Sequence, residues 1–269
     1  MKKLNAFLVA TVVALVSACG SGPTESEESA QAETTPSQAA SSSSDDNVNS
    51  LTGEEKNEGW KLLFDGQSTQ GWRGAHQESF PEKGWHIKDG LLVVESADGA
   101  ESGNGGDIVT NADYQDFEFK VDFKITEGAN SGIKYYVTEQ YNSGKSAIGL
   151  EYQILDDERH PDAKLGNNGG GTRTVASLYD LMAAPETKGI NAVGEWNTAH
   201  IVSKGGKVEH WLNGDKVLEY DRFSDEFAEK IAASKYKDWD GFGTWETGHI
   251  LLQDHGNEVH FKNIKVKEL

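Results

Sequence analysis

The stretch DFEFKVDFKIT, residues 116–126, alternates apolar and polar side chains along its whole length. Its apolar face consists of Phe117, Phe119, Val121, Phe123 and Ile125. Charged residues fill the intervening positions. A period of two residues is typical of a β-strand that buries one side and exposes the other. The stretch therefore predicts a strand of an antiparallel sheet whose inner face packs against a second layer.

Several further stretches are strand-like in the same way. They are GWHIKDGLLVVE (84–95), SGIKYYVT (131–138), GLEYQIL (149–155), TAHIVSK (198–204), GHILLQD (248–254) and EVHFKNIKVKE (258–268). In the last of these the apolar positions change parity near Asn263, which predicts a β-bulge. In KVEHWLNGDKVLEY (207–220), Asn213 and Gly214 separate two strand-like runs, and this pair favours a type I′ hairpin turn.

One stretch has a helical pattern. In FSDEFAEKIAASK (223–235), apolar residues recur every four positions at Phe223, Phe227 and Ile231, and Ser224 is a suitable N-cap. Many short strands with one short helix predict an all-β fold, a two-sheet antiparallel sandwich.

The N-terminal residues 1–18 have a positive start, an apolar run and a small-residue end, which are typical of an export signal. The sequence VSAC, ending at Cys19, resembles the lipobox of bacterial lipoproteins, which implies cleavage before Cys19 and a lipid on its thiol. The apolar run is shorter than the roughly 20 residues of a transmembrane helix. We therefore expect a lipid-anchored protein of the bacterial cell envelope, periplasmic or at the cell surface, that meets the membrane only through its anchor.

Residues 19–57 are rich in Ser, Glu, Ala and Thr and contain few large apolar residues. Such a segment buries too little apolar surface to offset the entropy of ordering it, so we expect a disordered acidic linker. The remaining residues, 58–269, are of a length typical of a single β-sandwich domain. Because Cys19 is the only cysteine, the folded part has no disulfide and no cysteine nucleophile.

The chain is strongly acidic, with 25 basic against 44 acidic residues and a formal net charge of −19. An acidic surface repels phosphate backbones, so nucleic acid is excluded as a partner and a neutral small molecule is favoured. The run DDERHPD (156–162) offers carboxylates and an imidazole but lacks the ligand pattern of a calcium loop. The sequence requires no cofactor and leaves a divalent metal ion open, with its ligands unknown.

Polar residues within the strand LEYQILDD (150–157) are candidates for chemistry. Alternation places Glu151 and Gln153 on one face, whereas Asp156 joins them only if a bulge follows Gln153. The spacing E-x-Q-x-x-D resembles the E-x-D-x-x-E strand of laminarinase-type β-glucanases, in which two carboxylates flank a glycosidic bond. Such a pair stands about 5–5.5 Å apart in a retaining glycosidase. The alternative is a rim strand with solvated acids.

A second candidate is ILLQDHG (250–256), in which Asp254 and His255 follow a strand. A carboxylate can orient an imidazole and raise its pKa, which would make His255 a better base. The alternative is a turn in which Asp254 caps backbone amides.

The long loop RHPDAKLGNNGGGTRTVASLYDLM (159–182) is typical of a mobile binding wall. Candidate substrate-binding residues on or near it are His160, Arg173, Tyr179 and Asp180. Each of these alone is equally consistent with a packing or surface role. His210 is a further candidate, although it shares its strand face with Val208 and Leu212 and so also fits a half-buried, satisfied histidine.

The tryptophans of KDWDGFGTWETGH (237–249) are candidates for stacking on a sugar ring, because they lie in a loop. They are Trp239 and Trp245.

Seven motifs together are similar to the 3-keto-disaccharide hydrolase domain family. They are GWKLLFDGQSTQGW (59–72), NSGIKYYV (130–137), GLEYQILDDERHPDA (149–163), ASLYDL (176–181), GEWNTAHIV (194–202), VEHWLNGDKVLEY (208–220) and GHILLQDHGNEVHFKNIKV (248–266). The resemblance implies a concanavalin-like jelly-roll sandwich, as in lectins and glucanases, and glycosides oxidised at C3 as substrates. One departure is His200, where similar sequences often have arginine.

A ketone at C3 acidifies the C2 proton and makes the C1 substituent a leaving group by β-elimination, and hydration then completes hydrolysis. We expect Glu151 and His255 to act as base and acid, in an order left open, and Asp254 to orient His255. Gln153 would donate to the ketone oxygen. Asp156 and His160 are second choices, including as metal ligands. Two alternatives are a non-catalytic carbohydrate-binding module and a conventional retaining glycosidase.

Overall fold

The strand predicted at residues 116–126 forms the middle of the larger of two β-sheets. In this computed structural model, β6 (Phe117–Ile125) lies between β9 (Asn197–Lys204) and β13 (Val259–Glu268) and alternates strictly between buried and half-buried residues. The structure describes residues 48–101, 103–141, 147–166, 168 and 170–269. The features expected at residues 1–47, including Cys19, lie outside these.

The larger sheet continues on both sides of this centre. Its strand order is β11 (Asp215–Asp221), β10 (Lys207–Leu212), β9, β6, β13, β4 (Leu91–Val94) and β3 (Trp85–Lys88), and β1 (Lys61–Leu62) pairs with the other end of β13. The smaller sheet has the order β2 (Trp72–Gly74), β5 (Ile108–Thr110), β12 (His249–Leu252), β7 (Asn130–Thr138) and β8 (Ile148–Leu155). Every strand pair is antiparallel.

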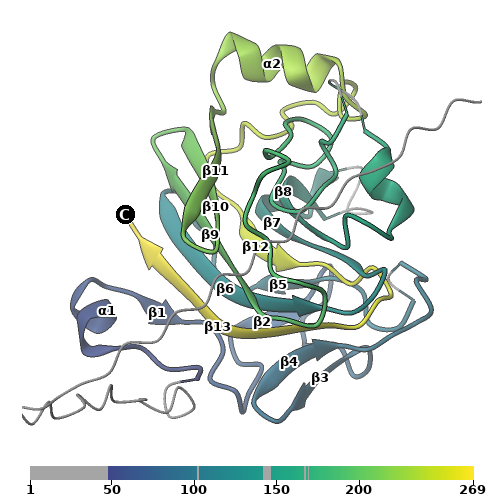
Figure 1. Cartoon of the computed structure of the whole chain (residues 1–269). Helices are drawn as coiled ribbons and strands as arrows, with labels where there is room; N and C mark the ends of the chain where they lie inside the picture. The colour runs from purple at the N-terminus through teal and green to yellow at the C-terminus, as the bar shows by residue number, and fades with distance from the viewer. Residues whose placement is uncertain (1–47, 102, 142–146, 167, 169) are drawn as a thin grey trace, which may run out of the picture. The chain divides into compact units, whose positions relative to one another are not determined.

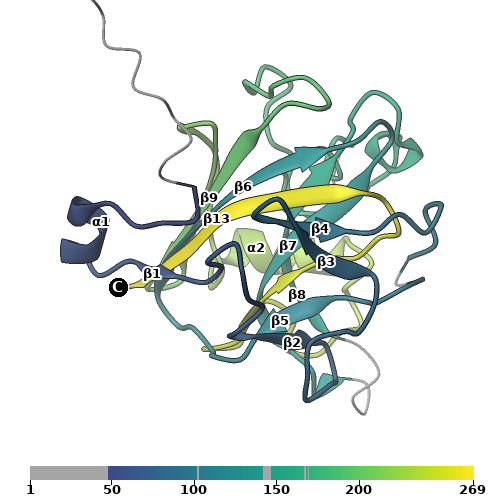
Figure 2. The same ribbon diagram turned by 90° about the horizontal axis from the view of Figure 1, so that it is seen from below.

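The two sheets pack face to face, as Figures 1 and 2 show from two directions. The core between them includes Phe119, Val121 and Phe123 of β6, Ile133 and Tyr135 of β7, and Tyr152 and Ile154 of β8. Each such side chain contributes about 1.5–3 kcal/mol by leaving water. The predicted two-sheet antiparallel jelly-roll sandwich is confirmed.

Local features follow their sequence signals closely. The β13–β6 register shifts between Lys262 and Lys265, and Asn263 has a φ of 53°, so the predicted bulge is present. Asn213 and Gly214 have φ values of 53° and 92°, as a type I′ turn requires at both positions. The predicted helix is α2 (Asp225–Ala232), capped by the hydroxyl of Ser224.

The folded part begins before residue 58, where the sequence analysis ended the linker. Asn49 exchanges two hydrogen bonds with the bulge residue Asn263, at 2.7 and 2.8 Å, and its side-chain amide donates to Gly90. A second short helix, α1 (Gly53–Asn57), follows with a capping box between Thr52 and Glu55. Polar contacts with β13 therefore order residues 48–57. The scarcity of large apolar residues, on which the linker was predicted, gives no sign of such contacts. No helix of the described residues is long and apolar enough to cross a membrane.

Candidate functional site

A cavity of about 490 Å³ lies on the face of the smaller sheet that is turned away from the larger sheet. Its floor carries Lys134 of β7 and Glu151 and Gln153 of β8, and these alternate with core residues such as Tyr135 and Tyr152. The strand parity expected for Glu151 and Gln153 is thus confirmed. Both are nevertheless buried, at 7% and 0% exposure, because loops cover this face of the sheet.

The register of β7 and β8 decides which residues meet on this floor. Lys134 pairs with Glu151, and Gly132 pairs with Gln153. Gly132 leaves the space that the Glu151 carboxylate occupies, because a Cβ at position 132 would collide with Glu151 Oε1. A charged pair across two strands with a glycine beside it is the centre of the candidate site.

No bulge follows Gln153, since the β7–β8 pairing continues without a shift to Leu155. The irregularity lies instead in β7, between Tyr135 and Thr138. The carboxylate of Asp156 faces away from the cavity and accepts hydrogen bonds from the backbone amides of Gly128, at 2.8 Å, and of two residues that follow it. The condition for bringing Asp156 beside Glu151 is therefore not met, and the two do not form the carboxylate pair of a retaining glycosidase.

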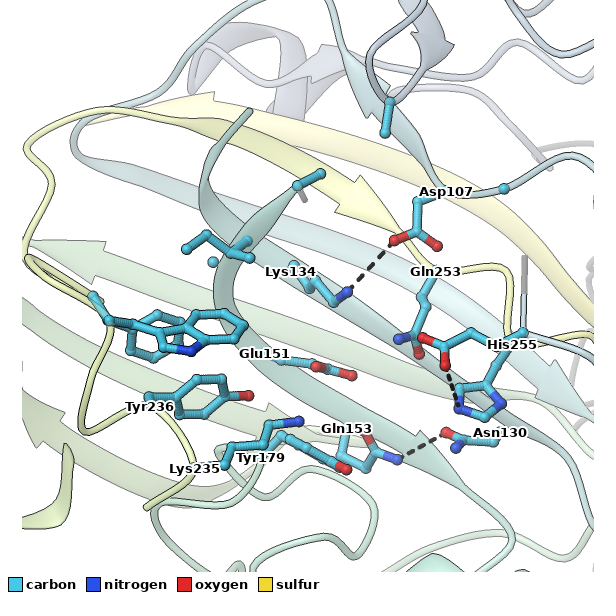
Figure 3. Close-up of a pocket in the computed structure, with 18 of the residues that line it drawn as sticks. Asp107, Asn130, Lys134, Glu151, Gln153, Tyr179, Lys235, Tyr236, Gln253 and His255 are labelled. Carbon is cyan, nitrogen blue, oxygen red and sulfur yellow. Dashed lines mark hydrogen bonds and ion pairs between the residues drawn. The ribbon is translucent and has the colours of Figure 1, made fainter. Parts of the chain in front are cut away.

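Opposite charges surround Glu151 in the cavity (Figure 3). Burial raises the pKa of Glu151, while the ammonium groups of Lys134 and Lys235 act against this rise. Burial alone would lower the pKa of Lys134, but Asp107, whose carboxylate lies 3.5 Å from its Nζ, and Glu151 raise it overall. Burial lowers the pKa of Lys235. The floor therefore holds a sheltered carboxyl group beside a firmly protonated lysine.

His255 lines the cavity across from Tyr236 (Figure 3). Its Nε2 lies 4.0 Å from a carboxylate oxygen of Glu101, and its ring meets the edge of His160 at a centroid distance of 6.0 Å. His160 itself caps a short 3₁₀ helix, η2 (Pro161–Lys164), through Nδ1. His160 therefore flanks His255 and is absent from the residues that line the cavity.

Asp254 does not orient His255, contrary to the sequence-based prediction. It is fully buried, and its carboxylate accepts hydrogen bonds from the amides of Gly106, at 3.0 Å, and Gly256, at 2.9 Å. Its own amide donates to Asp107 Oδ1 at 2.9 Å. Asp254 thus caps turn amides, which was the alternative interpretation, and it fixes Asp107 beside Lys134.

The loop at 159–182 supports the cavity through an ion-pair network. Arg173 donates to Asp162 at 2.6 Å and to Asp180 at 3.0 Å, and the hydroxyl of Tyr179 donates to Asp162 at 2.9 Å. The other oxygen of the Asp180 carboxylate accepts the backbone amide of Lys235 at 3.1 Å. Of the candidates on this loop, Tyr179 alone lines the cavity, whereas Arg173 and Asp180 hold the segments that carry Tyr179 and Lys235.

An aromatic wall closes one side of the cavity and comes from the segment after α2. Tyr236 stacks on Phe242 at a centroid distance of 3.9 Å, and Trp239 packs edge-on against both rings. Trp239 lines the cavity, and its stacking on a sugar ring stays a prediction. Trp245 instead lines a second cavity of about 420 Å³.

Two histidines lie away from the cavity. His210 is fully buried in the core, with Nε2 2.8 Å from the hydroxyl of Tyr135 and Nδ1 2.9 Å from the Ala176 carbonyl oxygen. It is therefore a satisfied core histidine and not a substrate ligand. His200 contacts Glu118 in the larger sheet, so the departure at this position does not alter the site.

The acids of residues 156–162 do not converge on a metal position. Asp157 accepts the amide of Val175 and pairs with Lys188, while Asp162 pairs with Arg173. Within the described ranges, no group of three or more His, Cys, Asp or Glu side chains has the arrangement of a metal site.

Sequence reasoning missed several residues that line the cavity: Asp107, Asn130, Lys134, Lys235, Tyr236 and Gln253. The one local signal was Lys134, a charge inside the strand SGIKYYV on the same face as Gly132. Recognising it would have required the register that places it opposite Glu151.

A concave cavity with an aromatic wall and a few converging charged groups, here a buried acid and two lysines, has the features of a small-molecule site on a β-sandwich. Comparison with known families agrees. Residues 59–267 match the 3-keto-alpha-glucoside-1,2-lyase-like domain, and the chain belongs to this family.

One named relative and two solved structures are similar to most of the chain. A protein of Bacteroides thetaiotaomicron named 3-keto-disaccharide hydrolase is 36% identical over 234 residues, which are 79% of this chain and 79% of that protein. A crystal structure described as a glycosyl hydrolase of Parabacteroides distasonis is 35% identical, with a TM-score of 0.72, and covers 82% of this chain and 99% of its own. A second structure from that organism, with the same description, is 27% identical with a TM-score of 0.55 and covers 78% of this chain and 99% of its own.

Proposed function

We propose that this protein cleaves the glycosidic bond of 3-keto-disaccharides by abstracting the proton at C2, eliminating the C1 substituent and hydrating the product. The observation that carries the proposal is the buried Glu151 carboxyl group beside Lys134 in a cavity large enough for a small saccharide. The name of the Bacteroides relative supports the same substrate class.

Glu151 is the base in this proposal. A carboxylate sheltered from water is a stronger base than a solvated one, and burial raises the pKa of Glu151 in this direction. The C2 proton passes to Glu151, and the electron pair of the C–H bond moves onto the ketone oxygen at C3. The gain in basicity is useful because a proton next to a ketone is only weakly acidic.

Lys134 is the group that stabilises the negative charge as it develops on the ketone oxygen. The sequence predicts this role for Gln153, but the amide nitrogen of Gln153 donates to Asn130 Oδ1 at 2.9 Å. The ammonium group of Lys134 is held between Asp107 and the Glu151 strand, and the surrounding carboxylates keep it protonated. A fixed positive charge in a water-poor cavity stabilises an enolate strongly.

His255 is the acid that protonates the departing O1. The enolate re-forms the ketone while the C1–O1 bond breaks, which leaves a double bond between C1 and C2. Water then adds its oxygen to C1 and gives a proton to His255, while Glu151 returns a proton to C2, so the net reaction is hydrolysis and both groups regain their starting forms. Tyr236 and Trp239 supply aromatic faces that hold the sugar rings.

The two alternatives account less well for the cavity. A non-catalytic binding module would have aromatics on a shallow surface and no buried acid, whereas Glu151 is buried with a raised pKa. A retaining glycosidase needs a second carboxyl group close to Glu151, whereas position 153 is an amide and Asp156 faces away.

The proposal predicts that the full-length protein releases monosaccharide from a 3-keto-disaccharide and not from the same disaccharide before oxidation. In D₂O, deuterium at C2 of the product would show that Glu151 exchanges the abstracted proton with solvent before it returns a proton to C2. Product analysis by mass spectrometry and NMR, with a protein-free control for spontaneous exchange, measures both results. Cleavage of the unoxidised sugar would refute the mechanism. Parallel reactions with a chelator decide whether a divalent ion takes part.

We also propose that a lipid on Cys19 anchors the protein in the bacterial cell envelope, which the sequence VSAC and the export signal support. In this arrangement the saccharide reaches the cavity from outside the cytoplasm. Cell fractionation of the Cys19→Ala variant checks the anchor, since that variant should leave the membrane fraction.

A further inference from the structure

Two glutamine side chains flank Gly132 on the floor of the cavity. Gln153 of β8 is the register partner of Gly132, and on the other side the backbone amide of Gln253 donates to the Gly132 carbonyl oxygen at 3.0 Å. Both glutamine side chains line the cavity (Figure 3). Gly132 has no side chain, and the carboxylate of Glu151 occupies the space beside it, so the two amides share this part of the floor with the proposed base.

The amide oxygens of both glutamines lack a hydrogen-bond donor among the described residues. Gln153 is fully buried, and its nitrogen already donates to Asn130 Oδ1 at 2.9 Å, which fixes the amide with its oxygen on the other side. Gln253 is 7% exposed. A buried acceptor without a donor is costly, and such groups in a native protein usually have a functional reason. Two of them in one cavity indicate that the ligand brings the donors.

We propose that the amide oxygens of Gln153 and Gln253 accept hydrogen bonds from two hydroxyl groups of the bound saccharide and thereby determine which sugars the protein accepts. This inference rests on the proposed function in that the ligand is a saccharide. A ketone oxygen has no proton to donate, so the two glutamines read hydroxyl groups other than the oxidised one. Lys134 contacts the ketone in this arrangement, because the Lys134–Glu151 pair is the next one along β7 and β8 on the same face of the sheet.

The consequence is a strict requirement for those hydroxyl groups. A site built to bond a hydroxyl group rejects an analogue without it, because the protein acceptor then stays buried and unpaired. An apolar side chain of similar length should remove this discrimination. Methionine is the closest replacement for glutamine in shape.

The experiment uses calorimetry to measure how tightly saccharides bind to the full-length Glu151→Gln protein. This variant should bind a 3-keto-disaccharide without cleaving it. The probes are this disaccharide and analogues in which one hydroxyl at a time is replaced by hydrogen or by fluorine. Hydrogen and fluorine both remove the donor, whereas fluorine keeps a weak acceptor. Three double variants are compared with the Glu151→Gln protein. Each adds one further substitution: Gln153→Met, Gln253→Met or, as a matched control at an exposed position, Gln67→Met.

At two hydroxyl positions we expect both replacements to weaken binding about tenfold to hundredfold. Gln253→Met should reduce this penalty to less than about threefold at one position, Gln153→Met should do so at the other, and Gln67→Met should change neither. The inference is overturned if the penalties persist in the methionine variants, if fluorine analogues bind like the parent sugar, or if the parent sugar does not bind. If the wild-type protein, which retains Glu151, bound the 3-keto-disaccharide without cleaving it, the proposed reaction would be refuted. The binding comparisons would remain valid.

Discussion

Replacing Glu151 with glutamine should lower kcat/KM for a 3-keto-disaccharide by about 10²- to 10⁴-fold, the range typical of a lost general base. Glutamine keeps the shape of the side chain in the space opened by Gly132 but cannot accept the C2 proton. Steady-state kinetics with the purified variant measures the loss. The proposal predicts a fall in kcat with little change in KM, because the carboxyl group acts on the transition state.

The matched control for this substitution is Glu118→Gln. Glu118 is a partly buried carboxylate of the larger sheet, with Lys267 and His200 as partners. Its replacement should affect stability and leave turnover within about twofold of the wild type. Near-wild-type turnover by a folded Glu151→Gln variant, judged by circular dichroism, would remove Glu151 from the mechanism.

The pH dependence of the wild type follows from the same group. Glu151 works as a base only when ionised, and burial raises its pKa above the ordinary value of 4.5. Activity should therefore fall as the pH decreases through a pKa that lies above 4.5. The Glu151→Gln variant should lose this acidic limb from its pH–rate profile.

The parts of this molecule that depend on local sequence were predictable. Alternation placed Glu151 and Gln153 on the same face, Asn213 and Gly214 fixed a hairpin, and the change in parity at Asn263 revealed a bulge. Each of these follows from backbone geometry within a few residues, because side chains alternate along a strand and few residues tolerate a positive φ.

The composition of the cavity was not predictable, because it depends on which strands pair and in what register. Lys134 and Glu151 are neighbours only through the β7–β8 register. The shift in this register lies in β7, between Tyr135 and Thr138, and not after Gln153. Asp254 was expected to orient His255, but its carboxylate accepts hydrogen bonds from the backbone amides of Gly106 and Gly256 instead. Lys235 reaches the site from a distant segment held by Asp180.

Replacing Lys134 with methionine should lower kcat by about 10²- to 10³-fold, as when a donor to a developing oxyanion is removed. Methionine fills most of the space of the lysine chain but carries no charge to stabilise the enolate. The substitution should also shift the acidic limb of the pH–rate profile to higher pH. The reason is that the Lys134 ammonium opposes the rise in the pKa of Glu151, and without it the carboxyl group binds its proton more tightly.

These two effects separate a role at the ketone from a role in folding. Lys124→Met is the matched control, because Lys124 lies over the ring of Trp196, away from the residues that line the cavity. It should change neither kcat nor the position of the acidic limb. If Lys134→Met shifts the limb but keeps kcat, Lys134 acts only on the ionisation of Glu151 and another group must stabilise the enolate. If it changes neither, the charge opposite Glu151 has no part in the reaction, and the arrangement of acid and lysine across β7 and β8 loses its proposed meaning.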